Sequence, residues 1–205
     1  MRLGQDQIEA LAECADLINT GRPTTGGHPG SLATTADVIE FGRRHRVENL
    51  AAARAGDVAR LADLRGRLDA VARACERGDE ADAITGVNAL LAETGAVPQI
   101  VAHDGRGPHI HVSRPAAPLA DRIVAHCAMG LAELVVAGAS HRLRSCASPD
   151  CAAVFVDLSR NQARRYCDSR TCGNRVHVAA YRARQASRGV QQEELGAPAA
   201  TFSSS

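Results

Sequence analysis

Four cysteines in the last third of the chain have the spacing of a metal site. They form two close pairs, each with four intervening residues, and fifteen residues separate the pairs: Cys146, Cys151, Cys167 and Cys172. Zn²⁺ binds thiolates in tetrahedral geometry, and two pairs on tight turns supply four such ligands. Four thiolates leave no position for a substrate, so the spacing predicts one structural zinc ion per chain.

Two disulfide bonds are the alternative arrangement of these cysteines. A reducing cytoplasm disfavours disulfides, and we expect a cytoplasmic protein without a membrane partner. No apolar run is long enough to span a bilayer, and acidic residues interrupt the first apolar segment, unlike a secretory signal. A segment of about forty residues also has too small a core to fold without a metal.

A histidine pair is the second candidate for chemistry. His109 and His111 alternate on an expected strand, so both imidazoles point to one face, and His103 is close in sequence. These side chains could hold a catalytic metal. However, no carboxylate stands at ligand spacing with them, and the chain has no nucleophile elbow or nucleotide-binding motif. We therefore expect no enzymatic activity.

The basic residues are concentrated around the cysteine pairs. All 24 are arginine, and the net charge of +1 hides their uneven distribution. Residues 142–188 hold 10 Arg against 3 acidic residues, whereas residues 1–141 hold 14 Arg against 18 acidic residues. A basic module on an acidic body is typical of a protein that binds a polyanion.

The remainder of the chain is predicted to be mainly helical. Aromatic residues make up only 2% of the sequence, so Leu, Val, Ile and Ala must fill the core, which suits helix packing. Residues 99–112 alternate like a small β-hairpin. Cys14, Cys75 and Cys127 lie singly on helical apolar stripes and are expected to be buried core residues. Apolar residues recur at helical spacing in five segments: 6–18, 35–46, 57–77, 79–94 and 118–137. Thr34 or Thr35 can cap the second helix and Asp57 the third, whose apolar stripe runs from Leu61 to Cys75 and which stops at Gly78. The fourth is expected to turn Ile84, Val87, Leu90 and Leu91 inward.

These elements predict a mainly α fold with two domains and a tail. A helical N-terminal domain covers residues 1–140, and a small zinc-binding ββα-like finger covers residues 141–188. Within the finger, we expect a strand at residues 152–157 and a helix at residues 173–187. The tail, residues 189–205, has few apolar side chains and is expected to be disordered.

The finger sequence resembles a known family. Residues 172–175 read Cys-Gly-Asn-Arg, the motif that names the CGNR zinc finger, and residues 155–161 and 164–167 fit the same pattern. In that family the finger follows a helical ABATE domain, which is regarded as a regulator of stress-induced transcription. Residues 15–20 and 32–33 look like the start of such a domain. The resemblance implies a DNA-binding transcriptional regulator.

Arginines of the finger are the candidate contacts with double-stranded DNA. Their guanidinium groups suit phosphate oxygens and the edge of guanine. We expect a narrow face of the finger helix, Val176 with three alanines, to pack on the zinc core while basic faces point outward. The candidate nucleic-acid-binding residues are Arg160, Arg164, Arg165, Arg175, His177, Tyr181, Arg182 and Arg184.

Local structural roles are the alternative for several of these residues. Four thiolates on Zn²⁺ carry a net charge of −2, which nearby arginines can neutralise. Arg160 could pair with Asp157, and Arg175 could cap the site. We expect structural roles for Gly173, which permits a tight turn past the metal, and for Asn174, which bonds the backbone or caps the helix.

Two functions from different classes fit the sequence. The first is a DNA-binding regulator whose helical domain senses a small-molecule effector or forms a homodimer. An effector would bind near the loop at residues 21–30 and the hairpin, because both are irregular and polar. The second is a protein-interaction module whose basic finger docks an acidic partner protein.

Overall fold

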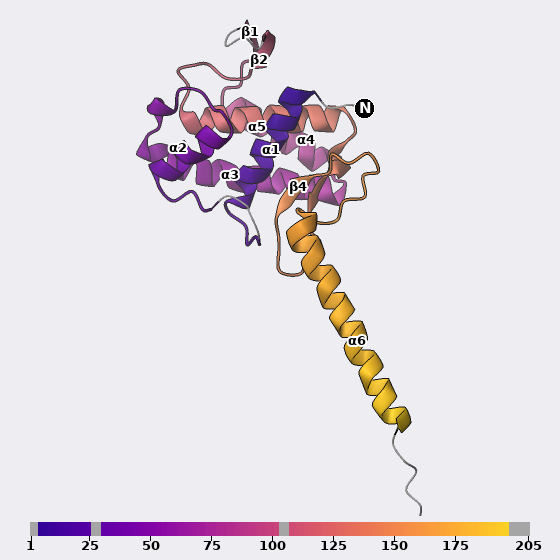
Figure 1. The fold of residues 1–205 in the computed structure, drawn as a ribbon. Coiled ribbons are helices and arrows are strands. Elements are labelled where there is room, and N and C mark those ends of the chain that lie inside the picture. The colour runs from indigo at the N-terminus through magenta and orange to yellow at the C-terminus, as the bar shows by residue number, and fades with distance from the viewer. Residues whose placement is uncertain (1–3, 26–29, 103–106, 197–205) are drawn as a thin grey trace, which may run out of the picture.

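The protein consists of a helical body and one long helix that stands away from it (Figure 1). The computed structural model describes residues 4–25, 30–102 and 107–196, with side chains up to residue 185. The helices of the body are α1 (Gln5–Asn19), α2 (Thr35–Arg44), α3 (Ala55–Arg77), α4 (Glu80–Glu93) and α5 (Leu119–Val136). The expected mainly α fold is confirmed.

Four of these helices, α1, α3, α4 and α5, pack around one apolar core. The predicted stripe of α3 is buried along its length, from Leu61 to Cys75. Cys14 and Cys127 are also fully buried, so the single cysteines of the helices are core residues as expected. Short aliphatic side chains fill this core because they pack at close helix–helix distances.

Helix boundaries follow the predicted capping residues. Thr34 caps α2, and Asp37 returns the hydrogen bond in a capping box. The buried Asp57 carboxylate accepts a hydrogen bond from Arg54 N at 2.7 Å and a second from Ala120 N at 3.0 Å. Asp57 therefore joins the N-terminal ends of α3 and α5 as well as capping the former. Gly78 ends α3 in the left-handed conformation, with φ of 71°.

The buried face of α4 includes Val87 and Leu90, as predicted, but not Ile84. Ile84, expected to point inward, is 42% exposed, whereas Ala83 is buried. The cause is the close approach of α4 to α3: a Cβ on Gly86 would lie 2.5 Å from Val71. The small residues of α4 thus face its neighbour, and the bulkier Ile84 is turned away.

The predicted hairpin is present beside the body. Strands β1 (Gln99–Ala102) and β2 (Pro108–His111) pair antiparallel, with Gln99 opposite His111. A hydrogen bond of 2.6 Å from Val97 N to Val112 O continues the pairing toward the body. His103 lies outside the described residues.

The finger follows α5 and shares the core of the body. Strands β3 (Leu143–Ser145) and β4 (Val154–Val156) pair antiparallel, with Arg144 opposite Phe155. Leu143 and Val154 are buried in the core of the helical body, whereas Phe155 is buried in a second small core with the four paired cysteines. The alternation of β4 therefore connects the two cores.

The last helix, α6 (Asn174–Gly196), follows a π-helical turn at Ser169–Gly173. It is longer than the helix expected at residues 173–187, because the Gln- and Glu-rich sequence that follows favours helix despite its low apolar content. Residues 197–205 of the expected tail lie outside the described residues. No helix in the described part of the chain is long and apolar enough to cross a membrane.

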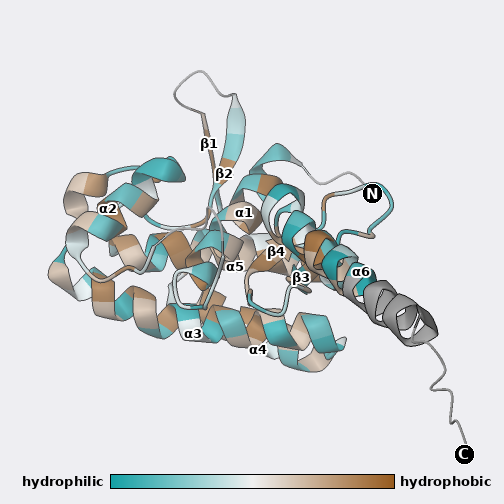
Figure 2. Cartoon of the chain, turned by 60° about the horizontal axis from the view of Figure 1, so that its bottom comes forward, coloured by the Kyte–Doolittle hydropathy of each residue, from teal (hydrophilic) through white to brown (hydrophobic). Residues whose placement is uncertain are grey.

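The orientation of α6 contradicts one expectation. We expected Val176, Ala179 and Ala180 to pack on the zinc core, but Val176 is only half-buried and both alanines are exposed. Figures 1 and 2 show the reason: α6 points away from the body, and much of its surface is hydrophilic. An alanine face buries too little apolar area to hold a helix against a small core.

Candidate metal centre and basic helix

The four predicted zinc ligands converge in the finger. Their Sγ atoms all lie within 4.8 Å of one another, and all four residues are buried cysteines that form no disulfide. Cys167 Sγ is 3.8 Å from Cys151 Sγ and 3.6 Å from Cys172 Sγ. A tetrahedral ion with metal–sulfur bonds of about 2.3 Å separates its sulfur ligands by about 3.8 Å. The group therefore has the dimensions of a four-thiolate metal site.

The electrostatics of the four thiols favour a bound cation. Burial and the neighbouring thiols of Cys172 and Cys146 raise the pKa of Cys167. Burial also acts to raise the pKa of Cys151, but hydrogen bonds from the backbone of Thr25 and Ala153 outweigh it and lower this pKa to about 7. Four thiolates at this spacing repel one another, and a divalent cation removes that repulsion.

Backbone hydrogen bonds hold the two cysteine pairs together. Cys146 N donates to Ala153 O at 2.8 Å, which closes the turn of the first pair. Ala147 N donates to Arg165 O at 2.8 Å, and Cys167 N donates to Cys146 Sγ at 3.4 Å. Hydrogen bonds therefore attach the second pair to the first.

A segment of the body forms hydrogen bonds with the finger, and the sequence did not predict this contact. We call residues 20–25, which follow α1, the clasp loop. The Arg22 guanidinium donates to Ser145 Oγ at 3.0 Å and to Ala152 O at 2.9 Å, and it also pairs with Asp69 of α3. Thr25 Oγ1 lies 3.2 Å from Cys172 Sγ, so its hydroxyl can donate to a metal-bound thiolate.

Comparisons with known proteins agree with this division into body and finger. The family model of the CGNR zinc finger matches residues 142–185. The ABATE model, described as "Putative stress-induced transcription regulator", matches residues 11–138, more than half of the chain. The chain belongs to the ABATE family. The search of curated proteins finds no match.

One candidate DNA contact, Arg164, serves the finger itself. Its Nε donates to Tyr166 O at 2.8 Å, and its Nη2 donates to Cys167 O. The guanidinium also lies 5.0 Å from the centre of the Phe155 ring, within the small cysteine core. These contacts give Arg164 a local structural role, and because the residue is also exposed, its contact with nucleic acid stays a prediction.

Asp157 organises the loop that leads to the second cysteine pair. Its fully buried carboxylate accepts hydrogen bonds from Ser159 N at 2.9 Å and from Arg164 N at 2.8 Å. Burial opposes its charge, but these hydrogen bonds and Arg144 lower the pKa of Asp157. The ion-pair partner is Arg144, at 3.5 Å, and not the expected Arg160. The sequence did not predict this ion pair, because Arg144 and Asp157 are far apart in the chain and are brought together by the antiparallel pairing of β3 with β4.

The remaining candidate contacts lie on the exposed surface of the ABATE protein's finger. Arg160 and Arg165 are exposed on the loop before Cys167, and the Arg165 guanidinium lies 5.9 Å from the centre of the Tyr166 ring. The other candidates are all exposed on the first half of α6: Arg175, His177, Tyr181, Arg182 and Arg184. All eight candidates are therefore exposed, and Arg164 differs from the others in donating hydrogen bonds to carbonyl groups of the finger.

Gly173 and Asn174 differ in detail from their expected roles. Gly173 is buried, and a Cβ at this position would lie 3.3 Å from Tyr166 Cδ2, so lack of space explains the glycine better than a tight turn does. Asn174 is exposed at the start of α6. Asp168 caps the preceding turn instead, accepting hydrogen bonds from Arg170 N at 2.6 Å and Thr171 N at 3.1 Å.

Proposed function

We propose that this ABATE protein is a DNA-binding transcriptional regulator whose contact surface is the first half of α6. One observation carries the proposal. From Ser169 to Gln185 the chain has four arginines and no acidic residue, and α6 extends away from the body (Figure 1). A helix that points into solvent with unopposed positive charge can approach a polyanion without a steric barrier.

The dimensions of α6 suit a DNA groove. A helix of 23 residues is about 35 Å long, and the major groove of B-DNA is wide enough to admit one helix. Arg175 and Arg182 share one side of α6, and Arg184 lies on another with His177 and Tyr181. Arginines on both sides of an inserted helix would contact the phosphates of the two flanking strands.

We propose Zn²⁺ as the ion of the cysteine site. The donors are four thiolates, which zinc binds in closed tetrahedral sites, and no ligand position remains for a reaction. Cys172 lies in the π-helical turn that leads into α6, so the bound ion would fix the direction of the helix relative to the body. The role of the metal in this proposal is structural, and the protein has no catalytic activity.

Anisotropy titrations on labelled duplex DNA test the proposal. The test variant carries Arg182→Glu and Arg184→Glu, far from the metal, and the control carries Arg43→Glu and Arg44→Glu, an equal charge change on exposed positions of α2. The unaltered protein and the control should bind with a steep salt dependence. The test variant should bind at least about tenfold more weakly, and its log–log salt slope should fall by about 2. Equal weakening of both variants would mean that net charge, and not α6, attracts the DNA.

An acidic protein partner is the second candidate for the same helix. Val178 and Tyr181 are exposed apolar side chains among the arginines, as at many protein interfaces. If non-specific duplex DNA fails to bind even at low salt, while an acidic helical peptide binds and loses affinity in the α6 variant, the protein-docking function replaces the DNA-binding one.

We propose further that the helical body senses an effector or forms a homodimer, and that the protein acts in the cytoplasm. The family description as a regulator supports a role in transcription. Residues of α1 and of β4 belong to the same core. This shared core supports the proposal that a conformational change in the body alters the finger, because a change in the packing of α1 would move β4.

A further inference from the structure

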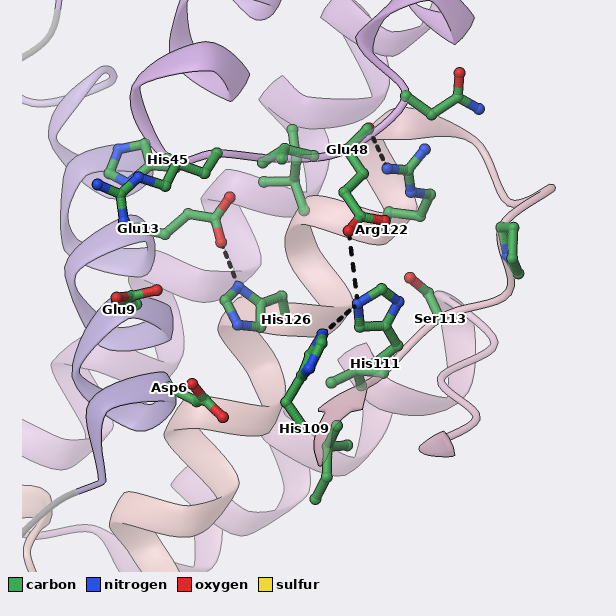
Figure 3. A pocket seen from close by; sticks show the side chains of 17 residues that line it. Asp6, Glu9, Glu13, His45, Glu48, His109, His111, Ser113, Arg122 and His126 are labelled. Carbon is green, nitrogen blue, oxygen red and sulfur yellow. Dashed lines mark hydrogen bonds and ion pairs between the residues drawn. The ribbon is translucent and has the colours of Figure 1, made fainter. Parts of the chain in front are cut away.

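A pocket lies on the side of the body that faces the hairpin. Its volume is about 200 Å³, and residues from α1, α5, β2 and the segment after α2 line it (Figure 3). Three acidic side chains on one face of α1, Asp6, Glu9 and Glu13, form one wall. Arg122 of α5 lies on the opposite side in the same view. The pocket therefore has acidic side chains along α1 and the Arg122 guanidinium on the other side, where the Glu48 carboxylate also lies.

Unpaired buried atoms gather in this pocket. Five buried side-chain polar atoms in the described part of the chain have no hydrogen-bond partner, and three belong to pocket residues: Glu13 Oε1, His45 Nε2 and Arg122 Nη1. Glu13 is the clearest case because its side chain is only 2% exposed. A buried polar group without a hydrogen-bond partner costs free energy, so such groups are rare unless a ligand supplies the missing partner.

Known contacts within the pocket do not account for these atoms. His126 Nδ1 lies 2.6 Å from Glu13 Oε2, which leaves Oε1 of the same carboxylate unpaired. Arg122 donates through Nη2 to Glu48 O, which leaves Nη1 unpaired. His45 Nε2 is 3.3 Å from Asp16 Oδ2 without the geometry of a hydrogen bond.

The chemistry of the two clearest atoms defines what would complete them. A carboxylate oxygen accepts hydrogen bonds, so Glu13 requires a donor, and an ammonium group is the donor that best matches its charge. The guanidinium of Arg122 only donates, so it requires an acceptor, and a carboxylate is the best match. The pocket lining also includes three aliphatic side chains, Ile110, Val112 and Ile123.

The spacing along α5 fits a short ligand. Arg122 and His126 are four residues apart, about 6 Å along the helix axis. Because His126 contacts Glu13, the two α5 residues nearest the acidic and the guanidinium ends are about one helical turn apart along the helix. A molecule with an ammonium and a carboxylate joined by a few carbon atoms spans this distance.

We infer that the pocket binds a small aliphatic amino acid, with its ammonium group on Glu13 and its carboxylate on Arg122. The binding is independent of what α6 contacts. That the bound amino acid acts as an effector rests on the proposed function of the finger. Binding is therefore measured without DNA first, so that a failure of one proposal does not conceal the other.

Probes that differ in one charged group test this inference. Thermal-shift and calorimetric titrations compare γ-aminobutyrate with butylamine, which lacks the carboxylate, and with butyrate, which lacks the ammonium. Glycine and ε-aminocaproate vary the distance between the two charges. At least one amino acid should bind about tenfold or more tightly than both singly charged compounds, because each loses one buried ionic contact.

Substitutions at the two ends locate the binding. Glu13→Gln and Arg122→Gln should each weaken binding of the preferred amino acid by about tenfold or more. Glu40→Gln and Arg43→Gln, an exposed ion pair on α2 outside the pocket, are the matched controls and should leave it unchanged. If Glu13→Gln does not fold, Arg122→Gln and the comparison with butylamine still decide the matter.

Three outcomes would overturn the inference. The first is that no amino acid binds at concentrations up to about 10 mM. The second is that butylamine binds as tightly as the amino acids, which would show a site for amines alone. The third is binding of NiCl₂ without binding of amino acids, abolished by His109→Ala. The Nε2 atoms of His109 and His111 are 3.1 Å apart, and the third result would assign this pair to a metal.

Discussion

The side-chain amide of Asn19 pairs with the backbone of Val154, 135 residues further along the chain. Its Nδ2 donates to Val154 O at 2.9 Å, and its Oδ1 accepts from Val154 N at 2.7 Å, so it satisfies both backbone groups of a buried strand residue. Asn19 thus takes the place of a neighbouring strand on the body side of β4. The last residue of α1 and the finger are therefore parts of one folded unit.

Replacing Asn19 with alanine should destabilise the whole protein. The change leaves a buried N–H and a buried C=O of Val154 without partners, which costs about 2–4 kcal/mol in the free energy of unfolding. Urea denaturation followed by circular dichroism measures it. Asn174→Ala, at an exposed position, is the matched control and should change the free energy of unfolding by less than about 0.5 kcal/mol. Similar effects of both changes would contradict this role of Asn19.

Metal removal should destabilise the body as well as the finger. We expect about one equivalent of zinc per chain by mass spectrometry after purification in reducing buffer. A strong chelator should lower the melting temperature of the entire chain in one transition, because Leu143 and Val154 belong to the core of the body. The competing result is a body transition that stays unchanged while only the finger signal is lost, which would show that the two cores unfold independently.

Arg164 and Arg165 are adjacent in sequence but should respond differently to substitution. Arg164→Gln removes hydrogen bonds to two carbonyl groups beside the metal site, so it should lower the free energy of unfolding by about 1–3 kcal/mol. Arg165→Gln, at an exposed position, should change stability little and instead reduce DNA affinity if its guanidinium contacts phosphate. Denaturation and anisotropy on the same two variants separate these effects. A stable Arg164→Gln protein would contradict the structural role.

Local sequence patterns predicted much of this fold. The helical periodicity from Leu61 to Cys75, the Thr34 cap and the Gly78 stop depend on residues close in sequence, and all are present. The cysteine spacing likewise predicted the grouping of the four thiols, because two close pairs with a short connection have few ways to meet.

Contacts between distant segments could not be predicted in the same way. The bonds from Asn19 to Val154 and from Arg144 to Asp157 depend on how helices and strands meet in space. The pocket depends on such meetings too, since the Glu13–His126 contact joins α1 to α5. The sequence predicted same-face histidines on the hairpin, but it did not show that α1 would bring acidic residues to the same pocket.

The contact between Glu13 and His126 should make stability depend on pH. Burial opposes the charge of His126, but the hydrogen bond with Glu13 and the nearby charges of Asp6 and Glu9 outweigh it and raise the pKa of His126 above the ordinary 6.5. Glu133 also faces this ring, and burial raises the pKa of its carboxyl group. Protonated His126 therefore stabilises the fold fully below pH 6.5, and this contribution is lost as the pH rises through the raised pKa. Because the ring is 39% exposed, solvent screening limits the contribution to about 1 kcal/mol or less. Urea denaturation of the unaltered protein and of His126→Gln, at pH values on both sides of this window, should show a stability difference that shrinks toward alkaline pH. A difference that stays constant or grows would show that His126 is neutral in the folded protein.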